Sequence, residues 1–333
     1  MICQFVTEHR TRWGVEPICK VLSEHGCTIA PRTYYAHLQR PPSRRALSDA
    51  RVTARIAVAR TPDQRGRLAP ESLYGAAKTQ AWLNRGRDPG EELVARCTVE
   101  RLMRAGQWVG AGRKKKFRTT IADPSHTRAE DKVKRNFVVP APNRLVVADF
   151  TDTPLASGTK AYTAFVIDAF AGTITGWDCS TSKATVFIER ALRQAGQFRR
   201  NQGNPLRGTT IHHSDAGSQY TSVHFAETLL IEGLVPSIGT VADAYDNALA
   251  ETTIGLFKTE CFRPGSPFLP RPPRTLADLE DAVATWAHWY NHTRLMHRLG
   301  LIPPLEYEAA YYAATRSAEP ASALTTECAS KSG

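Results

Sequence analysis

The spacing of apolar residues changes near residue 140 of this chain. Before that point apolar residues recur three or four positions apart, as at Val15, Ile18 and Leu22, which is the spacing of one face of an α-helix. From Arg144 onward, short apolar runs end at glycine or polar residues and alternate with longer segments of helical spacing. The pattern predicts an all-α front part followed by an α/β domain.

The front part is expected to form two helical units. Residues 1–40 predict a pair of short helices in which Pro31 opens the later helix, a pattern typical of either a helix-turn-helix or an ordinary helical hairpin. Residues 41–68 predict a linker and a basic helix, and residues 69–118 a second helical unit. An extended linker over 119–142 then leads to the α/β domain.

Positive charge is concentrated in this front part. The chain has a net charge of +11, and its first 140 residues hold 27 Lys+Arg against 13 Asp+Glu, whereas the rest holds 16 against 19. This imbalance favours binding of a nucleic acid by the front part, although a basic surface can also serve solubility alone. The side chains expected to contact DNA are Arg32, Tyr34, Arg101, Arg113, Lys114, Lys115 and Lys116.

Residues 143–265 predict a ribonuclease H-like domain. The expected order is three strands, a helix, a strand, a helix, a strand and a helix, which gives a mixed five-stranded sheet with helices on both faces. The expected strands span 145–150, 162–169, 173–178, 209–214 and 235–238, and the expected helices span 183–198, 223–234 and 248–261. A C-terminal helical extension covers 266–314, and the small, polar residues 315–333 predict a disordered tail.

Cysteine usage and hydropathy argue against several classes of protein. The seven cysteines never occur as a Cys-x-x-Cys pair, so neither a zinc ribbon nor a disulfide framework is expected. Met1 leads directly into polar sequence without a recognisable signal peptide, and no apolar run approaches the roughly 18 residues of a membrane span. The reducing cytoplasm is the expected compartment.

Three carboxylates stand where the predicted sheet would gather them. Asp149 follows the apolar run of the first strand, Asp215 follows the fourth strand, and Glu251 lies on the helix after the fifth strand. Open α/β sheets place ligands at the carboxyl ends of their strands. Carboxylate oxygens suit hard cations that bind phosphate, and two Mg²⁺ ions roughly 3.5–4 Å apart can clamp the oxygens of an in-line phosphoryl transfer. The sequence therefore predicts one metal site formed by the three carboxylates.

Four further residues accompany this predicted site. Lys258 lies two helical turns beyond the carboxylate of its helix, where it could contact a phosphate or simply be a surface lysine. Asn247 could orient DNA or cap the helix, and His213 could support the site or pack at the end of its strand. Asp152, three residues after the first carboxylate and so on the opposite face of the strand, is a second acidic candidate for the site.

Four segments of the chain carry motifs in addition to these single residues. They are V-A-D-F-T at 147–151, H-S-D-A-G-S-Q-Y at 213–220, D-N-A at 246–248 followed by Glu251 and Lys258, and Y-N-H-T-R-L-M-H at 290–297. These motifs, with 35 residues between the second and third carboxylates, resemble the integrase core of bacterial insertion-sequence transposases. More narrowly, residues 1–310 are similar to the OrfB-type product of the insertion-sequence family numbered three. In that family an aromatic residue commonly stands where this chain has Asp152.

The resemblance implies a DDE polynucleotidyl transferase, an enzyme that cuts the ends of its element and joins the 3′-OH to target DNA. It implies that Asp149, Asp215 and Glu251 are the catalytic residues and the ligands of two Mg²⁺ ions, with Mn²⁺ as a substitute. The implied partners are double-stranded DNA of the terminal inverted repeats and of the target, further copies of this chain, and an upstream helix-turn-helix product. The implied location is the bacterial cytoplasm, at the nucleoid.

Two other functions are consistent with the same sequence. A DNA-binding regulator would need only the front helices and would leave the core inert, which the intact set of three acids disfavours. A metal-dependent nuclease of the same fold would cut without joining. Because cutting and joining use the same site, the sequence alone leaves this second alternative open.

Overall fold

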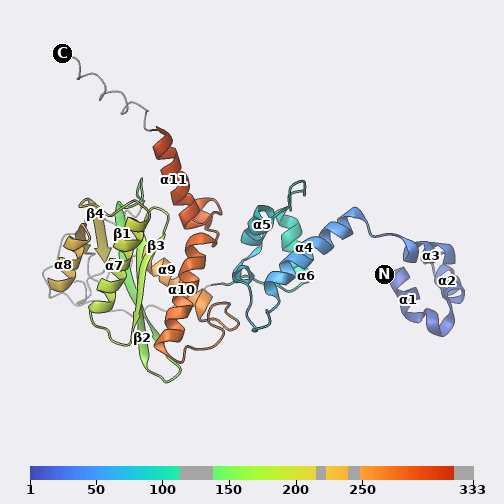
Figure 1. The fold of residues 1–333 in the computed structure, drawn as a ribbon. Helices are drawn as coiled ribbons and strands as arrows, with labels where there is room; N and C mark the ends of the chain where they lie inside the picture. Colours follow the sequence, from blue (N-terminus) through green and yellow to red (C-terminus); the bar gives the residue numbers. More distant parts are fainter. Residues whose placement is uncertain (113–137, 215–222, 239–247, 319–333) are drawn as a thin grey trace, which may run out of the picture. The chain divides into compact units, whose positions relative to one another are not determined.

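The computed structural model describes residues 1–112, 138–214, 223–238 and 248–318 (Figure 1). Within the chain two compact units are distinguished, Met1–Ala54 and Arg55–Gly333. The first is helical, and the second contains further helices and the five-stranded sheet. The expected sequence of an all-α front part and an α/β domain is therefore confirmed.

The first unit consists of short helices around one small core. Val6, Ile18 and Tyr34 supply that core from three successive helices, and all three side chains are buried. Gly14 ends the first helix with a φ of 79°, a left-handed conformation that glycine adopts without the steric cost of a Cβ. The helices are α1 (Ile2–Trp13), α2 (Val15–Glu24) and α3 (Pro31–Gln39), and α4 (Arg44–Arg60) begins in this unit and ends in the next.

The second unit begins with helices that are fastened to the rest of the unit by side-chain hydrogen bonds to the backbone. The Arg60 guanidinium donates to the carbonyl oxygens of Ser72 at 3.0 Å and Tyr74 at 2.8 Å. The buried Tyr74 hydroxyl in turn donates to the carbonyl of Thr293 at 3.3 Å and accepts from the N–H of Leu295 at 3.1 Å, so this region is tied to the C-terminal extension. Its elements are η1 (Pro70–Leu73), α5 (Ala76–Arg85) and α6 (Arg96–Ala105).

The sheet has the mixed topology that the sequence predicts. Its order is β3-β2-β1-β4-β5, in which β1 pairs antiparallel with β2 and parallel with β4, and β4 pairs parallel with β5. The strand β1 continues beyond the predicted end at residue 150, because the buried Thr151 and Thr153 keep the in–out alternation and pair with β2. The strands are β1 (Leu145–Pro154), β2 (Lys160–Asp168), β3 (Ile174–Ser180), β4 (Thr210–Ser214) and β5 (Leu234–Ile238).

Helices cover both faces of this sheet. On one face, Val146 and Ala148 of β1 pack with the helices α7 and α8. On the other, Leu145 and Val147 share a core with α9 and α10. The helices are α7 (Val186–Asn201), α8 (Val223–Ile231), α9 (Ala248–Cys261) and α10 (Leu276–His292), and α11 (Pro304–Ala318) follows α10 (Figure 1).

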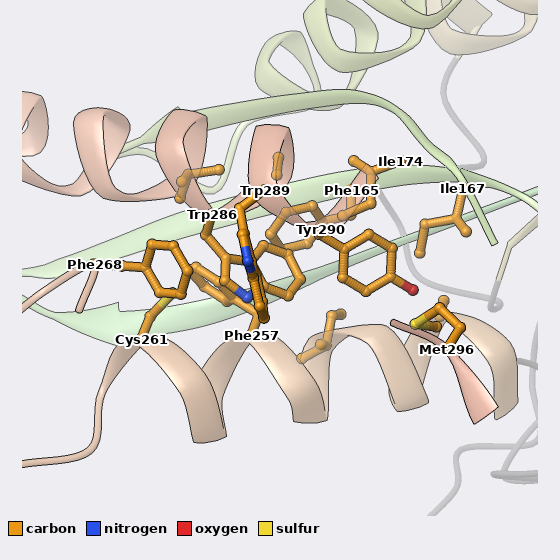
Figure 2. Close-up of a cluster of buried hydrophobic side chains, with 14 of the residues drawn as sticks. Phe165, Ile167, Ile174, Phe257, Cys261, Phe268, Trp286, Trp289, Tyr290 and Met296 are labelled. Carbon is orange, nitrogen blue, oxygen red and sulfur yellow. The ribbon is translucent and has the colours of Figure 1, made fainter. Parts of the chain in front are cut away.

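An aromatic cluster fixes α9 against the sheet. The ring of Phe165 on β2 lies 5.1 Å from that of Phe257 on α9 and 5.7 Å from that of Trp286 on α10, centroid to centroid (Figure 2). All three side chains are fully buried. Edge-to-face contacts between such rings add about 0.5–1.5 kcal/mol per pair to the effect of burying their apolar area.

A buried ion pair holds the end of the same helix. The Glu260 carboxylate accepts the indole N–H of Trp286 at 2.9 Å and pairs with the Arg294 guanidinium at 2.6 Å. These groups are at most 6% exposed, so removing one partner would leave the other charged and desolvated. Because Glu251 lies in the first turn of α9, these contacts also determine where that carboxylate stands.

Arg199 of α7 forms a second buried ionic cluster. Its guanidinium donates to Asp168 Oδ2 at 2.8 Å and to Glu308 Oε2 at 2.6 Å, and all three side chains are buried. Burial by itself lowers the pKa of Arg199, but the hydrogen bond to Glu308 and the charges of Asp168 and Glu308 outweigh it and raise the pKa above its ordinary value. The cluster joins β2, α7 and α11.

Replacing Arg199 by methionine should reveal how much this cluster stabilises the fold. Arg199→Met leaves two carboxylates buried without their counter-ion, so the free energy of unfolding should fall by ~3–5 kcal/mol. Urea denaturation at neutral pH measures the change. Arg193→Met, on the solvent side of α7 where the side chain is 60% exposed, should cost less than about 1 kcal/mol. Equal losses in the two variants would contradict a special contribution from the buried arginine.

Candidate active site

Two of the predicted carboxylates directly follow, in the sequence, a pair of residues that lie opposite each other on neighbouring strands. In the parallel pairing of β1 with β4, Ala148 lies opposite Ser214. The next residue on β1 is Asp149, and the next residue after β4 is Asp215, which lies outside the described residues. Parallel neighbours in a sheet are about 4.8 Å apart, so the residues that directly precede the two aspartates lie side by side at the carboxyl end of β4.

The third predicted carboxylate belongs to a helix on the same face of the sheet. Strand alternation puts Asp149 on the face of Leu145 and Val147, which share their core with Ala250 of α9. Glu251 follows Ala250 in the first turn of α9 and is exposed, at the positive end of the helix dipole. Asp149 is half-buried, and its Oδ1 accepts the N–H of Phe150 at 2.8 Å.

Asp152 and Lys258 meet at the far end of this region. The Lys258 ammonium lies 3.9 Å from Asp152 Oδ1, and that of Lys160 lies 4.0 Å from Oδ2. Asp152 is 53% exposed and Lys258 35%, which is the setting of a weak ion pair. Asp152 is therefore a counter-ion to lysines in this structure, whereas Asp149 lies directly at the edge where β1 and β4 pair.

The two histidines that precede Asp215 are buried in the sheet. His213 Nδ1 lies 3.0 Å from the hydroxyl oxygen of Ser237 on β5, so it joins the two strands beneath the site. His212 packs edge-on against Phe225, and its Nε2 has no hydrogen-bond partner in the described part of the chain. Burial, with a smaller contribution from His213, lowers the pKa of His212 to about 3. His212 is therefore neutral in the folded protein at neutral pH.

Comparisons with known proteins identify the family. Residues 139–244 match the model of the integrase core domain, and residues 232–304 match a second model of the same description. The chain is 47% identical over 285 residues to a Mycobacterium tuberculosis protein assigned to insertion sequence element IS986/IS6110 as its transposase, covering 86% of this chain and 96% of that protein. The chain belongs to the insertion-sequence transposases with an integrase core.

A second curated relative agrees with this assignment, and two solved structures show a lower similarity. The transposase for insertion sequence element IS629 of Shigella sonnei is 40% identical over 91% of this chain and 94% of its own length. Among solved structures, a simian T-cell lymphotropic virus intasome in complex with a PP2A regulatory subunit is similar with a TM-score of 0.42 and 16% identity, over 72% of this chain and 74% of that chain. The catalytic core of HTLV-2 integrase in complex with magnesium, in its dimeric form, is similar with a TM-score of 0.35 and 19% identity, over 47% of this chain and 92% of that chain.

In the parts of the transposase that the structure describes, three or more His, Cys, Asp or Glu side chains do not gather to form a metal site. One member of the predicted triad, Asp215, is outside those parts, as is Asn247. The metal ligands therefore stay a prediction, which the strand register and the position of α9 support. None of the helices in the described ranges is long and apolar enough to cross a membrane.

One of the expected DNA contacts needs correction. Tyr34 is completely buried in the core of the first unit, and its hydroxyl lies 3.2 Å from that of Thr7, so it packs the helices and cannot reach DNA. Arg32, two residues earlier on α3, is exposed, and Arg101 is partly exposed on α6. The predicted basic run of Arg113, Lys114, Lys115 and Lys116 lies outside the described residues.

The sequence reasoning missed two cations near Lys258. A groove of about 470 Å³ opens beside that lysine, and Arg263 and Arg271 line it. The signal available in the sequence was the stretch R-P-G-S-P-F-L-P-R-P-P-R at 263–274, in which basic residues are interleaved with prolines. A local sequence pattern could predict neither the groove nor its proximity to β1, because its walls come from segments more than 100 positions apart.

The buried His212 should make stability depend on pH. The folded protein keeps this imidazole neutral down to about pH 3, whereas the unfolded chain takes up a proton below about pH 6.5. The stability contribution is therefore present above pH 6.5 and is lost as the pH falls, by about 1.4 kcal/mol per unit. Urea unfolding measures this effect. Between pH 7 and pH 5, the free energy of unfolding of His212→Phe should fall by about 2 kcal/mol less than that of the wild type. The control His288→Gln changes an exposed histidine and should lose as much stability as the wild type. If His212→Phe also lost as much stability as the wild type, His212 would not be the source of the pH dependence.

Proposed function

We propose that this transposase cuts the ends of its insertion sequence and transfers the 3′-OH to target DNA by metal-dependent phosphoryl transfer at Asp149, Asp215 and Glu251. The observation that carries the proposal is the register of β1 and β4, in which the residues directly before Asp149 and Asp215 lie opposite each other. Support comes also from α9, which packs on the same face and carries Glu251 in its first turn. The relatives named as transposases, similar along nearly their whole length, support the transposase part of the proposal.

The donor set fits hard divalent cations. Three carboxylates offer only oxygen ligands, which is the chemistry of Mg²⁺ sites that act on phosphates, and Mn²⁺ accepts the same ligands. When bound, two such ions would polarise the attacked phosphate and stabilise the attacking and leaving oxygens. The buried acids Asp168, Glu260 and Glu308 are not alternatives, because each is already paired with a buried arginine.

The chain's own residues have distinct tasks in this proposal. The N–H of Phe150 orients the Asp149 carboxylate, and the packing of Phe257 and Glu260 holds the helix that presents Glu251. Lys258 lies seven residues further along α9, about 10 Å from Glu251 at 1.5 Å per residue, so it can bind a phosphate that flanks the reacting one. The reacting phosphate itself would lie at the edge of β1 and β4.

The remaining partners follow from the transposase assignment. We propose that Arg32, Arg101, Arg113 and the three lysines Lys114, Lys115 and Lys116 contact the phosphates of terminal-repeat or target DNA. His213 and Asn247 would support the loop segments that carry the carboxylates. The same proposal includes assembly of several copies of the chain on DNA, cooperation with an upstream helix-turn-helix product, and a place at the bacterial nucleoid.

A strand-transfer assay with a labelled element end, plasmid target and Mg²⁺ tests the chemistry. Asp215→Asn removes one metal ligand, which should cost several kcal/mol of transition-state stabilisation and reduce cutting about a thousandfold or more, while end binding survives. Asp149→Asn and Glu251→Gln should behave alike. Asp281→Asn, an exposed acid on α10, serves as the matched control and should cut normally.

The products of this assay separate the alternatives. Joined product supports transposition, cut product without joining supports a nuclease, and binding without either supports a regulator with an inert core. Asp152→Asn distinguishes the two acids of β1, because its carboxylate pairs with Lys160 and Lys258 and should not be needed for metal-dependent cutting. Wild-type cutting by Asp215→Asn would reject the proposed site.

The basic run can be tested through the salt dependence of binding. Each lysine that neutralises a DNA phosphate contributes about 0.9 to the slope of log K against log salt concentration, so joint replacement of Lys114, Lys115 and Lys116 by alanine should reduce the slope by up to ~3. Fluorescence anisotropy at several salt concentrations measures the slope. Arg193→Ala, on the exposed side of α7, should leave it as in the wild type. An unchanged slope in the triple variant would refute these contacts.

A further inference from the structure

The groove beside Lys258 combines apolar walls with several cations. Phe262, Leu269 and five prolines make up its apolar part. Lys258, Arg263 and Arg271 provide positive charge, and Asp152 is the single carboxylate among the residues that line it. The remaining lining residues are Thr153, Pro154, Pro264, Pro270, Pro272 and Pro273.

We propose that this groove binds one unpaired nucleotide of the DNA strand near the reacting phosphodiester. The base would lie on the apolar wall, and its phosphates would meet Lys258, Arg263 and Arg271. Base contacts of this kind tolerate any sequence, because every base has a flat apolar face, and nearby cations follow the backbone. The inference rests on the proposed function, since it places the groove along the path of the DNA substrate.

The size and position of the groove fit this occupant. Its volume of about 470 Å³ is in the range of small-ligand pockets and is far too small for a duplex. Lys258, which lines the groove, lies about 10 Å along α9 from Glu251, a distance that a stacked strand rising 3.4 Å per nucleotide covers in about three nucleotides. The nucleotide in the groove would therefore flank the reacting phosphate without being the reacting residue.

The charges of the groove favour a nucleic-acid strand over an apolar peptide. Three cations face one carboxylate, and that carboxylate lies 3.9 Å from the Lys258 ammonium. Ion pairs between side chains this exposed are weak, so a phosphate can displace Asp152 from Lys258. Asp152 would thus hold the lysine near the groove before DNA arrives.

Binding measured in EDTA tests the proposal without any cleavage. The probes are a fluorescent duplex with all terminal bases paired and the same duplex with its last few bases unpaired by mismatches. The full-length wild-type protein should bind the unpaired end about five- to tenfold more tightly, as expected from one base–protein contact. Arg271→Ala should lose most of this preference. Its affinity for the paired duplex should fall only by the amount expected from removing one charge.

The matched control is Arg274→Ala, which removes the same charge from an exposed position three residues away that does not line the groove. This variant should keep the preference for unpaired ends. A 2-aminopurine base in the unpaired segment reports the second property, because its fluorescence should rise on binding to wild type and Arg274→Ala but not to Arg271→Ala. Thermal melts of the three proteins verify that they are folded.

Two outcomes would overturn the proposal. One is equal affinity of the wild-type protein for paired and unpaired ends, as expected if the groove serves a protein partner. The other is an equal loss of preference in Arg271→Ala and Arg274→Ala, which would mean that the preference comes from the positive charge of the region and not from the groove. Because the assay contains no metal, Asp215→Asn should retain the preference. Loss of cutting and loss of the preference are therefore separate results.

Discussion

The buried contact between Glu260, Arg294 and Trp286 determines how α9 lies on the sheet. A charge pair that is almost completely removed from water tolerates few geometries, because each group must keep its partner and its hydrogen bonds. The rings of Phe257 and Phe165 meet on the same helix face, so apolar packing and ionic pairing specify one rotation of α9. The position of Glu251 at its first turn follows from that rotation.

The antiparallel pairing of the central strand β1 stabilises the sheet, and its parallel pairing ends next to Asp149. Its pairing with β2 is long and continues to Pro154, which gives the sheet a stable base. Its shorter pairing with β4 ends at Ala148 and Ser214, immediately before Asp149 and the segment that begins at Asp215. Asp149 is half-buried at this point, where the parallel pairing stops, so it stays partly accessible to solvent.

Some arginines of this protein are buried or paired within the fold, whereas others remain at the surface. The net charge of the sequence does not distinguish the two groups. Arg60 and Arg199 lie in the interior or bind backbone carbonyls, and Arg85 pairs with Glu306 of the C-terminal extension. Such groups stabilise the fold and contribute little to a DNA-binding surface. The arginines available for the proposed DNA contacts include the exposed Arg32 of α3 and the pair Arg263 and Arg271 that lines the groove beside Lys258.

The sequence by itself determined the order of strands and helices, the mixed sheet and the family, because apolar spacing and contiguous motifs are local properties. It also indicated that Asp149 stands on the first strand and that Asp215 directly follows the fourth. Only the tertiary structure decided that Tyr34 is a core residue, that Asp152 pairs with Lys258, and that the segment 263–273 forms a groove beside β1. The physical reason is that burial, ion pairing and groove shape depend on which faces meet. The partners in Asp168–Arg199–Glu308 and Glu260–Arg294 are far apart along the chain, so no local sequence pattern predicts these contacts.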